Sequence, residues 1–559
     1  MATTSAPSLS EPHRTHEVTN QSVPLTNYDV YAADTVLQEA VRREGAGWVE
    51  DRLHELGHIA GSEEAQRWGV EANENPPVLQ THDRYGHRID EVAYHPSYHR
   101  LMEVSIGHAL HALPWREPQP GAHVARSALF MSFRVDAGHG CPVSMTYSAV
   151  PALRKQPELA EEWEPRMLSL EYDQRLIRAE EKAGVTIGMA MTEKQGGSDV
   201  RANTTRARAL NGGGAGAEYE VTGHKWFCSA PMCDAFLVLA QTDEGVSCFL
   251  MPRVLEDGTR NRFRLQRLKD KLGNRSNASS EVEFDGAWAR MVGEPGRGVP
   301  TIIEMVNHTR LDCVVGSAAG MRTGTEQAIW HAKHRAAFGK LLADQPLMKN
   351  VLADLAIESE AATATAMRLA RAYDESAAGD EEATRFKRLA TAIGKYWTCK
   401  RWPVHAVEAL ESLGGAGYVE ASGMPRLFRE SPLNGIWEGS GNVISLDVLR
   451  ALARDPHGLE SVLAEIAQAS GAEPRLDTWL EGLRDELTDP ETMEMRARRI
   501  VEKLALALQA SLLVRHAPPA VADAFVASRL GGDGGRAFGT LPAGIDFDAI
   551  IERHAPAVA

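Results

Sequence analysis

The most informative feature of the sequence is a polar loop built around two adjacent glycines. It reads Met189-Ala-Met191-Thr192-Glu-Lys-Gln-Gly196-Gly197-Ser198-Asp. Glycine lets a backbone approach a flat or anionic ligand closely, because it has no Cβ. Hydroxyls and free N–H groups beside it can then bind the polar edge of that ligand. The same residues would also form an ordinary β-turn, so the loop alone leaves both interpretations open.

A glutamate lies in a second glycine-containing loop. The segment reads Ile436-Trp437-Glu438-Gly439-Ser440-Gly441-Asn442. A carboxylate in this place could cap a helix, because negative charge is stabilised at a helix N-terminus. In a dry pocket it could instead remove a proton from a weak carbon acid, since burial raises its basicity. Residue type alone favours the cap.

Two further segments combine aromatic, polar and cationic side chains. His224-Lys-Trp226-Phe227-Cys228-Ser229 is expected at the end of a strand, where Trp and Phe are core residues by default. Arg335 precedes Phe338, Gly339 and Gln345 in a turn between two helices. Its guanidinium could be a solvated charge at a helix end or a phosphate contact, because its planar fork matches phosphate oxygens.

Helices and a central β-region must position these segments. Apolar residues at helical spacing, such as Leu37, Ala40 and Val41, predict mostly helix between 26 and about 180. Short apolar runs separated by Gly, Asp and Asn predict a compact β-barrel or sandwich from 185 to about 290. A helical period returns from about 300. The predicted α+β multidomain chain has a helical domain 1–184, a β-domain 185–292, a helical-bundle domain 293–455 and a C-terminal helical domain 456–559.

Composition narrows the class of protein. A chain of 559 residues needs several cores. The formal charge of −16 argues against a surface that binds nucleic acid as a whole, because duplex affinity depends on Lys and Arg. No apolar run is long enough to predict a membrane span, and the polar N-terminus does not resemble a secretory signal. The six scattered cysteines predict neither a zinc site nor a disulfide framework, so a reducing cytoplasm is expected.

The first glycine loop resembles a signature of acyl-CoA dehydrogenases. Its residue sequence, Met-Thr-Glu-Lys-Gln-Gly-Gly-Ser-Asp-Val, is similar to that of the AidB-like branch of the family. Members of this branch are flavoproteins of the bacterial response to DNA alkylation. The resemblance implies the acyl-CoA dehydrogenase fold with an extra helical C-terminal domain, FAD as cofactor, and an acyl-CoA or similar thioester as substrate. The family's Trp/Tyr-Glu-Gly segment supplies a general base, so Glu438 is the implied base for the α-proton, while FAD takes the β-hydrogen as hydride.

The resemblance also assigns cofactor contacts. They are Met189, Met191, Thr192, Gly196, Gly197, Ser198, Trp226, Phe227, Cys228, Ser229, Arg335, Phe338, Gln345, Gly414, Gly415, Ile436, Trp437, Gly439, Ser440, Gly441 and Asn442. Cys228 stands where the family has a Thr or Ser that bonds the flavin near N5, and a thiol is a weak donor. Arg335, Phe338 and Gln345 match an element that reaches the FAD of a neighbouring subunit. A homo-oligomer, a dimer of dimers, is therefore implied.

The AidB-like branch further implies double-stranded DNA as a partner of the C-terminal domain. Arg496, Arg499 and Lys503 share one helical face and are the candidate DNA contacts. Upstream, Lys395, Lys400 and Arg401 could extend that patch. Acidic residues outnumber the Lys and Arg of 456–559, so a solvated, salt-bridged helix is the competing interpretation.

Three functions remain open at this level. The first is dehydrogenation of an acyl thioester. The second is protection or repair of alkylated DNA, with weak dehydrogenase activity. The third is a flavin oxidase or nitroalkane-type activity on the same fold, because Cys228 would alter the surroundings of the flavin ring.

Overall fold

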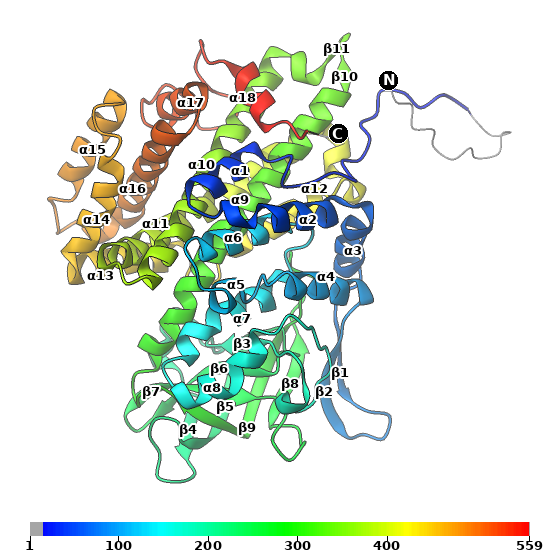
Figure 1. Ribbon diagram of the computed structural model, residues 1–559, viewed down its shortest axis with the longest axis vertical. Coiled ribbons are helices and arrows are strands. Elements are labelled where there is room, and N and C mark those ends of the chain that lie inside the picture. Colours follow the sequence, from blue (N-terminus) through cyan, green and yellow to red (C-terminus); the bar gives the residue numbers. More distant parts are fainter. Residues whose placement is uncertain (1–14, 558–559) are drawn as a thin grey trace.

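A β-barrel at one end of the molecule and long helices at the other enclose a layer of shorter helices (Figure 1). The computed structural model describes residues 15–557. The predicted order of helical, β and helical regions is confirmed. Within the described residues, no helix combines the length and apolarity needed to cross a bilayer.

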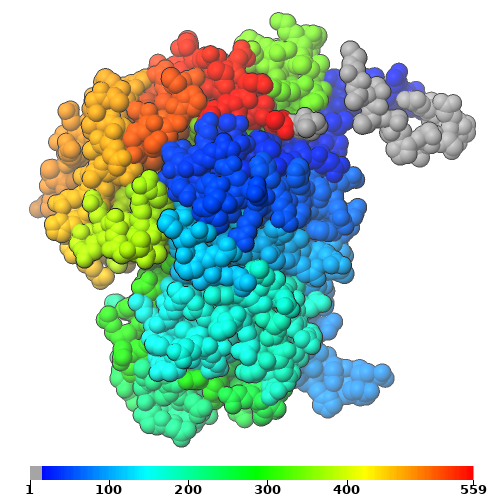
Figure 2. Space-filling view, in the orientation of Figure 1, coloured from blue at the N-terminus to red at the C-terminus, as the bar shows by residue number. Residues whose placement is uncertain are grey.

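The N-terminal region is mostly helical. Its helices are α1 (Thr35–Arg43), α2 (Glu50–Gly61), α3 (Glu63–Glu74), α4 (Pro96–Gly107), α5 (Leu113–Arg116), α6 (Ala122–Ser132), α7 (Gly140–Leu153) and α8 (Pro157–Met167). An antiparallel hairpin of β1 (Val78–His82) and β2 (Arg88–Ala93) interrupts them. It projects beside the barrel (Figure 2). The helical expectation for 26–180 was wrong here, where Asp83 and Gly86 form a hydrogen-bonded turn between two extended segments.

The β-region closes into a barrel. Its strands are β3 (Ile187–Ala190), β4 (Arg206–Ala209), β5 (Glu218–Ser229), β6 (Ala235–Thr242), β7 (Gly245–Pro252), β8 (Phe263–Leu268) and β9 (Ser279–Val292). The pairings β6–β4, β4–β5, β5–β9, β9–β7 and β7–β6 return to the first strand, so the ring has no free edge. Residues Ala235–Ala240 are all buried, because β6 also pairs with β3 and contacts α9.

Three long helices form the bundle above the barrel. They are α9 (Gly298–His334), α10 (Pro346–Ala377) and α11 (Glu381–Ser412). The short strands β10 (Ala336–Ala337) and β11 (Lys340–Leu341) connect the first two as a hairpin at the top of Figure 1. α12 (Met424–Glu430) and α13 (Gly441–Arg454) follow. At ~1.5 Å per residue, the 37 residues of α9 span about 55 Å, from the barrel to that hairpin.

The last hundred residues form a helical layer on the bundle. Its elements are α14 (Pro456–Ala467), α15 (Pro474–Glu486), α16 (Met493–His516), α17 (Pro519–Arg529) and α18 (Phe547–His554). α14 and α16 pack on α11, and α18 packs between α1 and α10. The end of the described chain therefore contacts its beginning.

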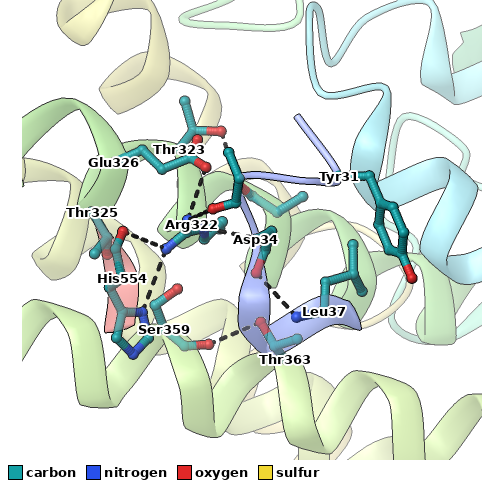
Figure 3. Close-up of polar contacts among 12 residues, drawn as sticks. Tyr31, Asp34, Leu37, Arg322, Thr323, Thr325, Glu326, Ser359, Thr363 and His554 are labelled. Carbon is teal, nitrogen blue, oxygen red and sulfur yellow. Dashed lines mark hydrogen bonds and ion pairs between the residues drawn. The ribbon is translucent and has the colours of Figure 1, made fainter. Parts of the chain in front are cut away.

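A buried network of ions joins these distant segments (Figure 3). The Arg322 guanidinium on α9 lies 3.2 Å from Asp34 Oδ2 and 3.0 Å from Glu326 Oε1. It also donates to the carbonyl of His554 at 3.0 Å. His554 Nε2 in turn lies 2.9 Å from Glu360 Oε2 on α10. One buried cation thus holds α9, the segment before α1 and α18 together.

Candidate active site

Glu438 lies on the loop that leads into α13. Its φ is +58°, a left-handed conformation that costs free energy for a residue with a side chain. Its Oε2 atom is buried and has no hydrogen-bond partner among the described residues. Burial raises the pKa of Glu438, against the opposing effects of the Thr309 hydroxyl and the charges of Arg310 and Lys395. A strained loop that presents an unsatisfied carboxylate is the arrangement expected of a base.

Side chains from three helices hold this loop. Arg310 Nε on α9 donates to the carbonyl of Glu438 at 3.0 Å, and its Nη1 lies 2.7 Å from Asp447 on α13. Lys395 Nζ on α11 donates to the carbonyls of Trp437, at 2.8 Å, and Gly439. Lys395 is buried, so it cannot belong to a surface patch as the sequence suggested. These contacts fix the backbone on both sides of Glu438.

The barrel carries the glycine-rich loop that the sequence predicts as a cofactor contact. The Met189–Asp199 loop is pinned to β5, because Trp226 N donates to Thr192 O at 2.8 Å and Lys225 Nζ lies 2.9 Å from the buried Glu193. A Cβ on Gly197 would lie 2.4 Å from Thr192 Oγ1, so glycine lets the two segments of the loop approach closely. Gly196 has φ +135°. Gly196, Gly197 and Ser198 are exposed, which leaves their backbone open to a ligand.

Strand β5 corrects the expected role of Cys228. Its thiol is completely buried in the barrel core, near Arg253. Ser229 faces the other side of the strand and remains partly exposed. The same alternation leaves Phe227 half exposed, while the Trp226 ring lies beneath Lys269 Nζ at 3.1 Å. A ligand on the outward face of this end of β5 would therefore meet the Ser229 hydroxyl rather than a thiol.

Cys141 lies at the start of α7. Burial raises the pKa of its thiol to about 12, and the nearby Glu438 carboxylate adds to the shift. The Ser229 side chain lies beside the same thiol and opposes the shift. Trp437 packs against the apolar core of the barrel, and its Nε1 donates to Asn434 Oδ1 at 2.8 Å. Cys141 therefore lies near both the Glu438 loop and the end of β5.

The structure does not bring every predicted contact to this site. Arg335 caps α9, so at ~1.5 Å per residue it lies about 37 Å from Arg310. It donates to the carbonyl of Asn20, while Phe338 is 99% exposed. Gln345 Nε2 donates to the carbonyl of Ala337 at 3.1 Å.

The other predicted glycines divide between two places. Gly414 and Gly415 follow α11, about 28 Å from Lys395 by the same rise, and both have open space where a Cβ would lie. Gly439 lies directly after Glu438, Ser440 is the N-cap of α13, and Gly441 and Asn442 begin that helix. Ile436 is 64% exposed.

The candidate DNA contacts are already paired within the protein. Arg499 and Lys503 meet one oxygen of Glu486, and Arg496 lies 3.7 Å from its other oxygen. Arg496 also lies 3.5 Å from Asp489. Upstream, Arg401 is paired with Glu358 at 3.0 Å. The salt-bridged interpretation of this helical face therefore describes what the structure contains.

The functional residues that sequence reasoning missed are those that hold the catalytic loop. Thr309 and Asn434 carried no motif signal, Arg310 was interpreted only as part of a long helix, and Lys395 was considered only as a surface cation. Arg310 and Lys395 are charged residues inside otherwise apolar helical stretches. Buried charge in such a stretch requires a partner, so this pattern was a usable signal.

Comparisons with known proteins identify the family of the chain. Residues 20–174 match the model of the adaptive response protein AidB N-terminal domain. Residues 188–287 and 296–453 match the middle and C-terminal domains of acyl-CoA dehydrogenases. The chain is 45% identical over 526 residues to AidB of Escherichia coli (strain K12), covering 93% of this chain and 96% of that protein.

More distant relatives share the same architecture. Acyl-CoA dehydrogenase family member 11 of Caenorhabditis elegans is 30% identical over 459 residues, 78% of this chain and 72% of its own. The crystal structure of C. elegans ACDH-11 in complex with C11-CoA superposes with a TM-score of 0.83 at 26% identity, covering 99% of this chain and 96% of the other. The chain therefore belongs to the acyl-CoA dehydrogenase family, in its AidB-like branch.

Proposed function

We propose that the protein oxidises an acyl thioester to its α,β-unsaturated product, with Glu438 as the base that removes the α-proton. The observation that carries this proposal is the buried, unpaired Oε2 of Glu438 on a loop held by Arg310 and Lys395. FAD is the cofactor of this family. When bound, it supplies the acceptor for the β-hydrogen.

The residues of the glycine loop and of β5 fit a flavin. The exposed backbone of Gly196 and Gly197 offers N–H groups to the polar edge of a flat ring, and the partly exposed Ser229 offers a hydroxyl at the end of β5. The unsatisfied carboxylate of Glu438 and the Ser229 side chain both lie near Cys141. Arg335 and Phe338 of the same chain are not among the residues that we propose to contact the flavin ring.

Each protein group has a task in proton removal. Burial makes Glu438 more basic than a solvated carboxylate, while Lys395 and Arg310 keep its charged form accessible. Trp437, packed on the barrel, shields the carboxylate from water, which strengthens its interaction with the α-hydrogen. The base acts in its ionised form, so activity must rise with pH through the raised pKa of Glu438.

The direct test is anaerobic bleaching of the bound flavin by a panel of acyl-CoAs that includes C11-CoA, the ligand of the ACDH-11 complex. Rapid loss of flavin absorbance and formation of an enoyl thioester are the expected results. If the protein binds FAD firmly and no thioester bleaches it, acyl-CoA dehydrogenation is excluded. Oxygen-dependent turnover of a nitroalkane in the same assay would favour the oxidase alternative.

Duplex DNA binding is not favoured as the second function. Glu486 contacts all three candidate cations, Arg496, Arg499 and Lys503, and Asp489 also contacts Arg496, so these two carboxylates offset two of the three positive charges. Contacts to DNA require cations that can release their counterions and bind the phosphates of the duplex instead.

We also propose a reducing, cytoplasmic location. The six cysteines are buried free thiols, which fits that proposal.

Lys395 should act as a positioning residue. In Lys395→Met, the Glu438 loop loses both carbonyl contacts, and we expect kcat to fall by about 10- to 100-fold because the base is misplaced. Loss of the ammonium also raises the pKa of Glu438 further, so the acid limb of the kcat/KM profile moves to higher pH. Arg385→Met, an exposed change on the same helix, is the control. An unshifted acid limb would refute an electrostatic role for Lys395.

We also propose a homo-oligomer, a dimer of dimers, in which the β10–β11 hairpin reaches a neighbouring subunit. Phe338, at the tip, is 99% exposed with φ +53°, and Leu347 nearby is 84% exposed. Large apolar side chains that are exposed on an ordered hairpin are typical of a protein–protein interface. Phe338→Asp should reduce the mass measured by light scattering and weaken FAD binding. Tyr85→Asp, at the distant β1–β2 turn, should leave the mass unchanged, and equal masses for all three proteins would contradict the assembly.

A further inference from the structure

A partly buried lysine is linked to the end of β5 that carries Ser229. Lys271, in the loop between β8 and β9, donates from Nζ to the carbonyl of Asn277 at 2.6 Å and to Ser279 Oγ at 3.2 Å. Ser279 on β9 pairs directly with Ser229 on β5, so their side chains lie on the same face of the sheet. Their two hydroxyl oxygens are 3.2 Å apart. Lys271, Ser279 and Ser229 therefore form one hydrogen-bonded chain.

Contacts with α12 hold the loop that carries Lys271. The backbone N–H of Asn274 donates to both carboxylate oxygens of Glu430, at 2.7 and 2.8 Å. A Cβ on Gly273 would lie 2.3 Å from the carbonyl oxygen of Arg429, so the loop and α12 are in close backbone contact. The start of the hydrogen-bonded chain is therefore fixed to the helical part of the protein.

The charge of Lys271 has no close ionic partner. Within residues 15–557, no carboxylate oxygen lies within 4.0 Å of its Nζ. Burial lowers the pKa of Lys271 to about 8, against the opposing effects of Cys141 and Glu430, so the side chain is still mostly an ammonium at pH 7. A partly buried cation costs free energy, which two neutral acceptors offset only in part. An effect on the two hydroxyls would account for this cost.

An ammonium can only donate hydrogen bonds, and this sets the direction of the chain. Lys271 donates to Ser279 Oγ, so the O–H of Ser279 is available to donate to Ser229 Oγ. The O–H of the partly exposed Ser229 is then left to donate to a ligand. A charge-assisted bond polarises the hydroxyls that follow it. Ser229 is therefore a stronger donor than an isolated serine.

We infer that Lys271 is a positioning residue of the flavin site, acting through Ser279 to hold the Ser229 hydroxyl as a donor to the ring. The inference deepens the proposed function and rests on it. A hydride carries one proton and two electrons, so the ring gains one negative charge while Glu438 takes the α-proton. A donor polarised by a cation stabilises that negative charge. Lys271 should therefore raise the reduction potential of the bound flavin.

The reduction potential of FAD in the full-length holoprotein tests this assignment. In Lys271→Met, at pH 7 and a fixed dye potential, we expect the ratio of reduced to oxidised flavin to fall about tenfold, a shift of about 30 mV for a two-electron couple. Ser279→Ala keeps the cation and interrupts the chain, so it should also lower the potential. Lys271→Arg should retain most of the wild-type value. Lys155→Met, which removes an exposed cation just after α7, should match the wild type.

The three variants also separate the ways in which the inference could fail. Equal potentials in Lys271→Met, Ser279→Ala and Lys155→Met would overturn it and leave the proposed function intact, because bleaching by acyl-CoA measures that function separately. A lower potential in Lys271→Met alone would show that the charge acts through space, and the hydroxyl chain would be wrong. If Lys271→Met does not fold or bind FAD, the potential of Ser279→Ala decides. Failure of the wild-type protein to bind FAD would instead remove the proposed function, and the inference with it.

Discussion

Glu438→Gln is expected to retain bound FAD and to slow bleaching by acyl-CoA by about 10²- to 10⁴-fold, the usual contribution of a general base. Glutamine keeps the shape of the side chain and the loop contacts, which are made by backbone carbonyls. It cannot accept the α-proton at the buried position of Oε2. The measurement is the rate of anaerobic flavin bleaching by stopped-flow absorbance.

The pH dependence gives an independent readout of the same base. Protonated Glu438 is inactive and its pKa is raised by burial, so the wild-type rate should increase with pH through a value above that of a solvated glutamate. This acid limb should disappear in Glu438→Gln. Glu460→Gln, an exposed carboxamide change on α14, should preserve both the rate and the limb. Equal rates in the two variants would show that another group removes the proton.

Arg322→Met is expected to lower the free energy of unfolding by about 3–5 kcal/mol, because it leaves buried carboxylates short of one cation. Asp34 and Glu326 are each 1% exposed, and Arg134 alone would remain to neutralise them. The His554 carbonyl also loses its donor, so the contact between α18 and α9 weakens. Urea unfolding followed by far-UV circular dichroism measures the change.

A double variant separates lost charge from lost packing. Arg322→Met combined with Glu326→Gln removes one charge of each sign and should be less destabilised than Arg322→Met alone. Arg385→Met breaks an exposed pair with Glu381 and should change the free energy of unfolding by less than about 1 kcal/mol. If Arg322→Met behaved like Arg385→Met, the buried network would not be a source of stability.

Local patterns of the sequence were sufficient for the order of the regions. Helical spacing and short apolar runs predicted helix, barrel and bundle, because those patterns follow from the repeat of each element and from which face it buries. The β1–β2 hairpin was missed within a helical region, although its turn carried Asp83 and Gly86. Glycine loops and the Glu438 segment were also visible, since their chemistry depends on residue type and short spacing.

What surrounds Glu438 was decided only by tertiary structure. Lys395 looked like part of a basic surface patch, and folding buries it against the carbonyls of Trp437 and Gly439. Cys228 looked like a flavin contact, but strand alternation turns it into the barrel core and leaves Ser229 partly exposed on the other side of the strand. Both outcomes depend on side-chain direction, which a motif does not specify.

The cations of α16 show the same division most clearly. Arg496, Arg498, Arg499 and Lys503 are equivalent in sequence, as basic residues on one helix. By itself, the sequence determined the fold family, the glycine loops and the presence of Glu438, because these are encoded by residue type and spacing. Only the tertiary structure decided which of these cations form ion pairs. It places three of them beside Glu486 and brings Arg498 to the side-chain oxygen of Asn442. The reason is physical: a charge is neutralised by whatever folding places within a few ångströms of it, and those neighbours come from distant parts of the chain.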